Sequence, residues 1–165
     1  MTRKEAAAAL GVPLSWLEAL ITVESNWNPK AKNPVSTARG LIQWVDETAG
    51  DLGYHSSLEL VTKNPTEGQQ LAEVVRTLKK YKPFAGETEF YLSVFAPAYR
   101  KKAWEELSPL AKSKNPKIRH YSDYVSHVVR KRELMEKGKK GEALPLSPVV
   151  PLVLFAALMF VTRGS

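Results

Sequence analysis

The sequence predicts a mainly α-helical fold, in which one helical domain is followed by a C-terminal transmembrane helix. Apolar residues recur at helical spacing through much of the chain, and no stretch alternates apolar and polar residues long enough for a sheet strand. A run of uncharged residues lies near the C-terminus. With 165 residues, of which 44% are hydrophobic, the chain is long enough for one domain with its own core.

Apolar periodicity predicts four main helices, at residues 13–25, 66–81, 87–99 and 120–137. A shorter helix is expected at the N-terminus, where Thr2 and Glu5 have the spacing of a capping box and Gly11 provides a stop. Residues 53–60 could instead form a short extended pairing. No internal repeat is visible.

Composition divides the chain into three parts. Residues 1–136 form the predicted helical domain, and residues 137–143, which are rich in Lys and Gly, predict a basic flexible linker. Residues 144–162 predict a transmembrane helix, because they lie in an uncharged run of 20 residues, about the length that crosses a bilayer. Three prolines crowd its start, where a helix tolerates them: Pro145, Pro148 and Pro151. A buried core helix or a partner-binding tail is the alternative.

The net charge of +7 favours an acidic partner, which could be nucleic acid, anionic lipid or an anionic cell-wall polymer. The sequence has no cysteine, so disulfides and Cys-based metal sites are excluded. His55, His120 and His127 lack metal-ligand spacing, so neither a metal nor another cofactor is expected. No nucleic-acid recognition motif is present, so no specific nucleic-acid partner is expected.

Glu24 is the first candidate for chemistry. It ends the predicted helix 13–25, whose apolar positions include Leu17, Leu20 and Ile21, and an irregular segment follows it at once. Apolar surroundings raise the pKa of a carboxyl group, and a raised pKa lets that group deliver a proton near neutral pH. A purely structural glutamate at a helix end is the alternative.

The residues after Glu24 form a longer pattern. An E-S pair is followed by an aromatic residue, by N-P, by an alanine and by an element of the type G-L-M-Q: Glu24, Ser25, Trp27, Asn28, Pro29, Ala31, Gly40, Leu41, Ile42 and Gln43. This segment resembles the transglycosylase SLT family, the lytic transglycosylases with a lysozyme-like fold. A later tyrosine motif of that family matches Tyr124, Val125 and Val128.

The sequence departs from the family pattern in two places. Residues 31–40 are one residue longer than usual, and Ser-Thr-Ala-Arg replaces the usual G-A before Gly40. The family's A-Y-N-A-G element has no clean counterpart, although residues 90–100 resemble the divergent form seen in some phage enzymes.

The resemblance implies a lytic transglycosylase that cleaves the β-1,4 bond between N-acetylmuramic acid (MurNAc) and N-acetylglucosamine (GlcNAc) of peptidoglycan and leaves a 1,6-anhydro-MurNAc end. Glu24 would be the catalytic acid and then the base, and Tyr124 would lie near its carboxyl group. The predicted substrate-binding residues are Ser25, Asn28, Gly40, Gln43 and Tyr124. Ser25 is expected to hydrogen-bond to Glu24, and Gln43 to bind an acetamido group or a ring hydroxyl. The helix of Gln43 is expected to pack across the cleft, with Gly40 allowing this close approach.

Three alternatives remain open. A hydrolytic lysozyme of the same fold would need a second carboxylate, for which Asp46 and Glu47 are candidates, although either could cap a helix instead. A non-catalytic, membrane-anchored structural protein would keep the lysozyme-like fold without its activity. A basic nucleic-acid-binding protein is the third. Core packing is expected for Trp16 and Trp104.

The N-terminal residues are too polar for a signal peptide, while the substrate lies outside the cytoplasm. We therefore expect a single-pass membrane protein of a bacteriophage, carried in a virion membrane or in the host inner membrane, that meets the cell wall during entry.

Overall fold

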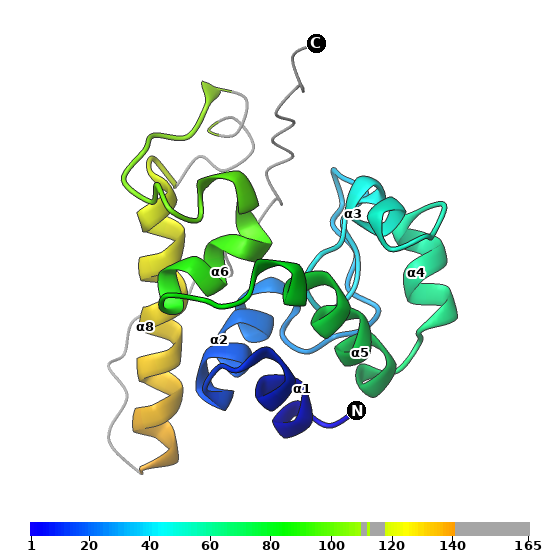
Figure 1. Cartoon of the computed structure of the whole chain (residues 1–165), viewed down its shortest axis with the longest axis horizontal. Helices are drawn as coiled ribbons and strands as arrows, with labels where there is room; N and C mark the ends of the chain where they lie inside the picture. Colours follow the sequence, from blue (N-terminus) through cyan, green and yellow to red (C-terminus); the bar gives the residue numbers. More distant parts are fainter. Residues whose placement is uncertain (110–111, 113–117, 141–165) are drawn as a thin grey trace.

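The computed structural model describes residues 1–109, 112 and 118–140, and within this part the regular structure is entirely helical (Figure 1). The α-helices are α1 (Arg3–Leu10), α2 (Leu14–Ser25), α3 (Asp46–Asp51), α4 (Ser57–Lys63), α5 (Glu67–Leu78), α6 (Glu87–Phe95) and α8 (Tyr121–Lys139). Two 3₁₀ turns, η1 (Lys79–Tyr81) and η2 (Pro97–Tyr99), continue α5 and follow α6. The mainly α-helical fold class is confirmed.

Local sequence accounts for the first helix as predicted. The Thr2 hydroxyl accepts the Glu5 N–H at 3.3 Å, and the Glu5 carboxylate accepts the Thr2 N–H at 2.8 Å, which completes the capping box. Gly11 ends the helix in the left-handed conformation, at φ 70°.

The short extended pairing at residues 53–60 is wrong, because α4 begins inside this segment. The Ser56 hydroxyl accepts the Glu59 N–H at 3.1 Å and so caps the new helix. Extended contacts within the described residues occur elsewhere, as isolated antiparallel bridges: Lys32 with Arg39, Arg39 with Trp44, and Glu106 with His120.

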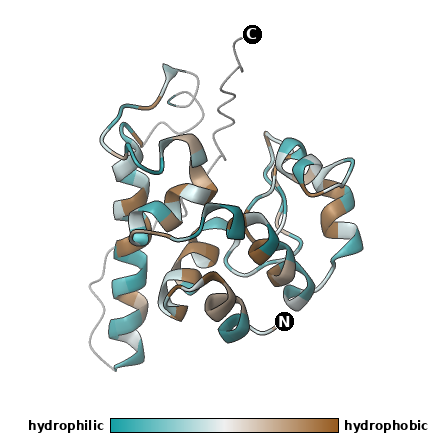
Figure 2. Cartoon of the chain, in the orientation of Figure 1, coloured by the Kyte–Doolittle hydropathy of each residue, from teal (hydrophilic) through white to brown (hydrophobic). Residues whose placement is uncertain are grey.

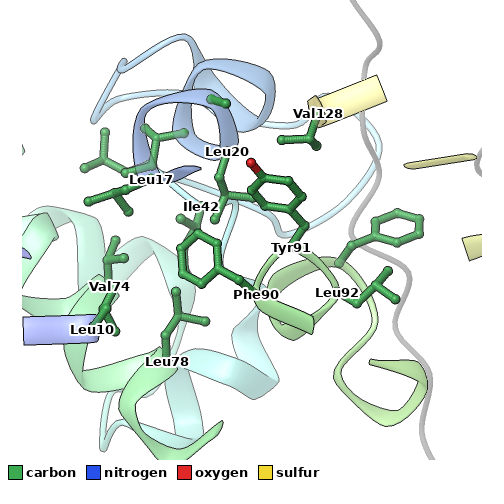
Figure 3. Close-up of a cluster of buried hydrophobic side chains, with 14 of the residues drawn as sticks. Leu10, Leu17, Leu20, Ile42, Val74, Leu78, Phe90, Tyr91, Leu92 and Val128 are labelled. Atoms are coloured by element: carbon green, nitrogen blue, oxygen red, sulfur yellow. The ribbon is translucent and has the colours of Figure 1, made fainter. Parts of the chain in front are cut away.

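The hydrophobic core joins the beginning of the chain to its later helices. Figure 3 shows Leu17 and Leu20 of α2 beside Phe90 and Tyr91 of α6, with Val128 of α8 close by. All five side chains are fully buried, and each contributes about 1.5–3 kcal/mol of hydrophobic stabilisation. Figure 2 shows apolar segments along α2 and α6, with hydrophilic residues along much of the last helix. Helix α2 is therefore packed against the later helices α6 and α8.

The last described helix is longer than predicted. Helix α8 continues to Lys139, so residues 137–139 of the predicted linker are helical, and lysines in a last turn are favoured by the helix dipole. The rest of the predicted linker, apart from Lys140, and the predicted transmembrane helix 144–162 lie outside the described residues. Among the described residues, no single helix has both the length and the apolar character of a membrane span; only α1 and α2 taken together, bent by 111°, meet these criteria.

The two tryptophans expected in the core differ. Trp16 lies against the aromatic rings of Phe90 and Tyr91, with ring centroids 6.3 and 6.5 Å apart. Trp104 is 71% exposed, so the prediction of core packing is wrong for this residue. Trp104 lies in a turn after α6, closed by the hydrogen bond from the Glu105 N–H to the Lys102 carbonyl at 3.0 Å, where a periodicity argument for helices does not apply.

Candidate active site

The packing of α2 against α8 brings Glu24 and Tyr124 together. The Tyr124 hydroxyl donates a hydrogen bond of 2.6 Å to Oε1 of Glu24, across 100 positions of the sequence. Tyr124 is fully buried and stacks on Phe95 of α6, with ring centroids 4.2 Å apart and planes inclined by 13°. Three helices therefore fix the position of the donor.

Two opposing effects set the acidity of Glu24. Burial of the carboxyl group disfavours its charged form, while the hydrogen bond from Tyr124 favours that form. Burial is the larger effect and raises the pKa of Glu24 to about 7. The residue as a whole is only half-buried. Such a carboxyl group can both give and take a proton near neutral pH.

The chain leaves α2 through two residues in the left-handed conformation, Asn26 at φ 51° and Trp27 at φ 61°. Residues other than glycine adopt this conformation at a cost in free energy, and surrounding contacts must hold them there. The Trp27 indole N–H donates to the Thr22 hydroxyl at 3.1 Å, and the Arg3 guanidinium lies 3.6 Å from the centre of its ring. These contacts fix the turn directly after Glu24.

Gly40 lies where its segment comes close to other parts of the chain, and its predicted role in substrate binding stays a prediction. Its φ is 74°, and a Cβ atom at this position would come within 2.7 Å of Oε1 of Gln70 and 2.9 Å of Cγ1 of Val61. Any larger residue would therefore strain the backbone and clash with two neighbours.

Gln43 lies in a turn, so the helix predicted for it is wrong. It is buried and also has a positive φ, of 54°. Its side-chain amide donates to the Gly40 carbonyl at 2.9 Å, so this part of the group stabilises its own loop. Its predicted contact with an acetamido group stays a prediction.

Ser25 does not make the predicted bond to Glu24. Its hydroxyl donates instead to the carbonyl of Ile21, one turn back in α2, at 3.3 Å, and a hydroxyl has a single proton to donate. Asn28 is exposed, and its side-chain oxygen accepts the N–H of Lys30 at 2.9 Å in a local turn. The structure thus joins Glu24 directly to Tyr124 only, among the predicted residues, and the substrate-binding roles of Ser25 and Asn28 stay predictions.

Asp46 and Glu47 both lie in the first turn of α3. Oδ1 of Asp46 accepts the backbone N–H of Ser57 at 2.8 Å and so caps the start of α4. Glu47 is exposed. The contact with Ser57 favours the structural alternative for Asp46.

Gln70 is an important residue that the sequence analysis did not select. It is fully buried on α5, and its oxygen accepts the Leu41 N–H at 3.0 Å. Its amide nitrogen donates to the carbonyls of Pro29 and Asn64, at 2.8 and 2.9 Å. A glutamine on the apolar face of a predicted helix was the available signal, since such a group must find hydrogen-bond partners when it is buried.

Comparison with known families bears on this part of the chain. Residues 1–74 match the family model of the transglycosylase SLT domain. The match confirms the predicted resemblance to the SLT family, and it includes Glu24, Gly40, Gln43 and Gln70. The SLT domain supports a peptidoglycan-cleaving function of the transglycosylase type. No curated protein and no solved structure gives a significant match.

Proposed function

We propose that the protein is a peptidoglycan lytic transglycosylase in which Glu24 is the catalytic acid and base. The observation that carries the proposal is the carboxyl group of Glu24, whose pKa burial raises to about 7 and which accepts a hydrogen bond from Tyr124. The SLT match at residues 1–74 supports the same class of reaction.

The proposed reaction needs one carboxyl group. Protonated Glu24 gives its proton to the glycosidic oxygen, and the bond from C1 of MurNAc to that oxygen breaks. The resulting carboxylate then takes the proton of the MurNAc C6 hydroxyl, whose oxygen forms a new bond to C1. The products are a GlcNAc hydroxyl and a 1,6-anhydro-MurNAc end, so no water is consumed. The Tyr124 hydrogen bond would stabilise the carboxylate between these two proton transfers.

A hydrolase of the same fold would produce reducing ends and would normally use a second carboxylate. The engagement of Asp46 by Ser57 favours a structural role for one of the two candidate carboxylates. We therefore prefer the transglycosylase reaction.

Glu24→Gln tests the proposal, because it keeps the size of the side chain and removes the transferable proton. We expect the clearance of purified peptidoglycan to slow by roughly 10²–10⁴-fold or more. Mass spectrometry of the wild-type products should show fragments one water lighter than hydrolysed ones. The matched control is Glu47→Gln, which should keep full activity. Full activity of Glu24→Gln would overturn the catalytic assignment, and only reducing-end products would indicate a lysozyme.

We further propose that the uncharged run of residues 143–162 anchors the protein in a membrane, and that the protein belongs to a phage virion. The apolar composition of this run and the basic residues before it support the membrane anchor. The full-length chain should float with liposomes in high salt and in alkaline carbonate, whereas a chain ending at Lys140 should not. Release of the full-length chain under both conditions would contradict a membrane span.

A further inference from the structure

Trp104 is the most exposed large aromatic residue in the described part of the chain, at 71%. The other tryptophans are engaged: Trp44 is buried and bonded to Thr77, while Trp16 and Trp27 pack against the core. An indole that faces water forgoes the hydrophobic stabilisation that burial would give it, and its aromatic face stays available for contact with a ligand.

The backbone around Trp104 is firmly held although its side chain is free. The Ala103 carbonyl accepts the Ser122 N–H at 2.8 Å, and the Glu105 carbonyl accepts the Tyr121 N–H at 3.3 Å. Burial alternates along this segment: Ala103 and Glu105 are half-buried, Leu107 is buried, and Trp104 faces solvent between them. The backbone thus holds Trp104 at an outward-facing position.

This segment adjoins the candidate site. Its hydrogen bonds reach the first turn of α8, and Tyr124, the partner of Glu24, lies two residues beyond Ser122. Figure 1 shows the loop after α6 lying against the N-terminal end of α8. Trp104 is therefore held beside the same helical turn that supplies the hydroxyl group to the catalytic carboxyl group.

The segment around Trp104 is open to solvent and carries charges of both signs, because Glu105 and Glu106 directly follow the indole. Lys101, Lys102 and Arg119 are exposed. The Arg119 carbonyl accepts the Leu107 N–H, which places Arg119 beside the segment that carries Trp104. Lys102 also lies 3.2 Å from the carboxylate of Glu105. An aromatic face flanked by cations suits a ligand that combines apolar C–H faces with negative charge.

We propose that Trp104 is a stacking platform for an amino-sugar ring of the glycan strand, outside the bond that is cleaved, with the carboxylates of the peptide stems facing the cations of this segment. The pyranose ring of a β-1,4-linked sugar presents axial C–H groups on its faces, and an indole ring covers such a face well. This inference rests on the proposed function for the identity of the polymer.

Binding and cleavage are separated by measuring retention on purified peptidoglycan in a Glu24→Gln background, in which the polymer stays intact. Adding Trp104→Ala should weaken this binding about tenfold, since truncating a tryptophan at the centre of a contact commonly has an effect of this size. Trp104→Phe should recover part of the loss. The matched control is Leu58→Ala on α4, another exposed apolar residue, which should bind as the parent does.

Salt and activity provide two further readouts. The loss caused by Trp104→Ala should persist at high salt, because stacking is not screened as charge pairing is. In the active enzyme the same substitution should raise KM and leave kcat nearly unchanged. Equal binding of the Trp104→Ala and Leu58→Ala variants to peptidoglycan would overturn the platform. Binding to vesicles of anionic lipid is measured in parallel, and a loss of that binding alone would also overturn it. If Trp104→Ala loses binding while Glu24→Gln remains active, the catalytic assignment of Glu24 alone is refuted.

Discussion

At the scale of single residues, the candidate site depends on one hydrogen bond between partly dehydrated groups. Burial and Tyr124 act on Glu24 in opposite directions, and the resulting pKa of about 7 is their balance. A change at Tyr124 should therefore act on acidity as well as on position.

Tyr124→Phe removes the donor that favours the charged form of Glu24. The pKa of Glu24 should rise further, by about one unit if the bond contributes about 1.5 kcal/mol. Because the first step requires protonated Glu24, kcat/KM falls as pH increases through this pKa, and that alkaline limb should move to higher pH. A pH–rate profile on peptidoglycan measures the shift.

Tyr91→Phe is the matched control for this profile. Tyr91 is also a buried tyrosine, and its hydroxyl has no hydrogen-bond partner among the described residues. Its profile should follow the wild type. An unshifted limb in Tyr124→Phe would show that the hydrogen bond does not tune the group that titrates.

The sequence predicted the partnership of Glu24 and Tyr124 through the family pattern, but it misplaced the bond of Ser25. A serine near a helix end can donate to a neighbouring side chain or to the carbonyl one turn back, and the sequence does not distinguish these choices. The structure has the second, with Ile21 as the acceptor.

At the scale of elements, the loop between α2 and α3 is held from outside by α5. Gln70 makes two hydrogen bonds to residues of that loop, Pro29 and Leu41, and a third to Asn64 after α4, and Gly40 lies directly against it. The helix therefore sets the shape of the segment that carries Gln43.

Gln70→Met keeps a side chain of similar length and leaves Leu41, Pro29 and Asn64 without their partner. We expect a loss of about 2–4 kcal/mol in the free energy of unfolding, because buried backbone groups lose their hydrogen bonds. Urea denaturation measures it. The control Gln69→Met changes an exposed neighbour that bonds only within its own cap, and it should cost less than about 1 kcal/mol. Equal losses would contradict a special role for Gln70.

Helices of different length were not equally predictable. The long ones carry enough apolar positions to reveal their period, whereas α3 and α4 have six and seven residues and few apolar ones. Part of what stabilises α4 is the Asp46 carboxylate, eleven positions before Ser57, and such a distant cap leaves no local pattern.

At the scale of the whole molecule, the family match and the physical core have different extents. The SLT match ends at residue 74, yet Phe90, Tyr91, Tyr121 and Val128 are fully buried in the same core as Leu17 and Leu20. Residues 1–74 therefore contain the candidate acid Glu24 but lack the later helices against which its own helix packs.

A chain of residues 1–74 should not fold cooperatively, because removing the later helices exposes the inner face of α2. A chain of residues 1–140 should show one sharp thermal transition and clear peptidoglycan. Circular dichroism during heating distinguishes the two chains. A sharp transition in the shorter chain would show that the N-terminal part is a domain by itself.

The hydrogen bond between Glu24 and Tyr124 also has a consequence for the order of events in biosynthesis. It spans 100 positions, so Glu24 is synthesised long before Tyr124 is added to the growing chain. Contacts between such distant positions form late in folding, because a large loop must close first. The nascent chain should thus be unable to cut glycan until α8 has been made and docked, which ties the onset of a wall-degrading activity to the completion of the fold.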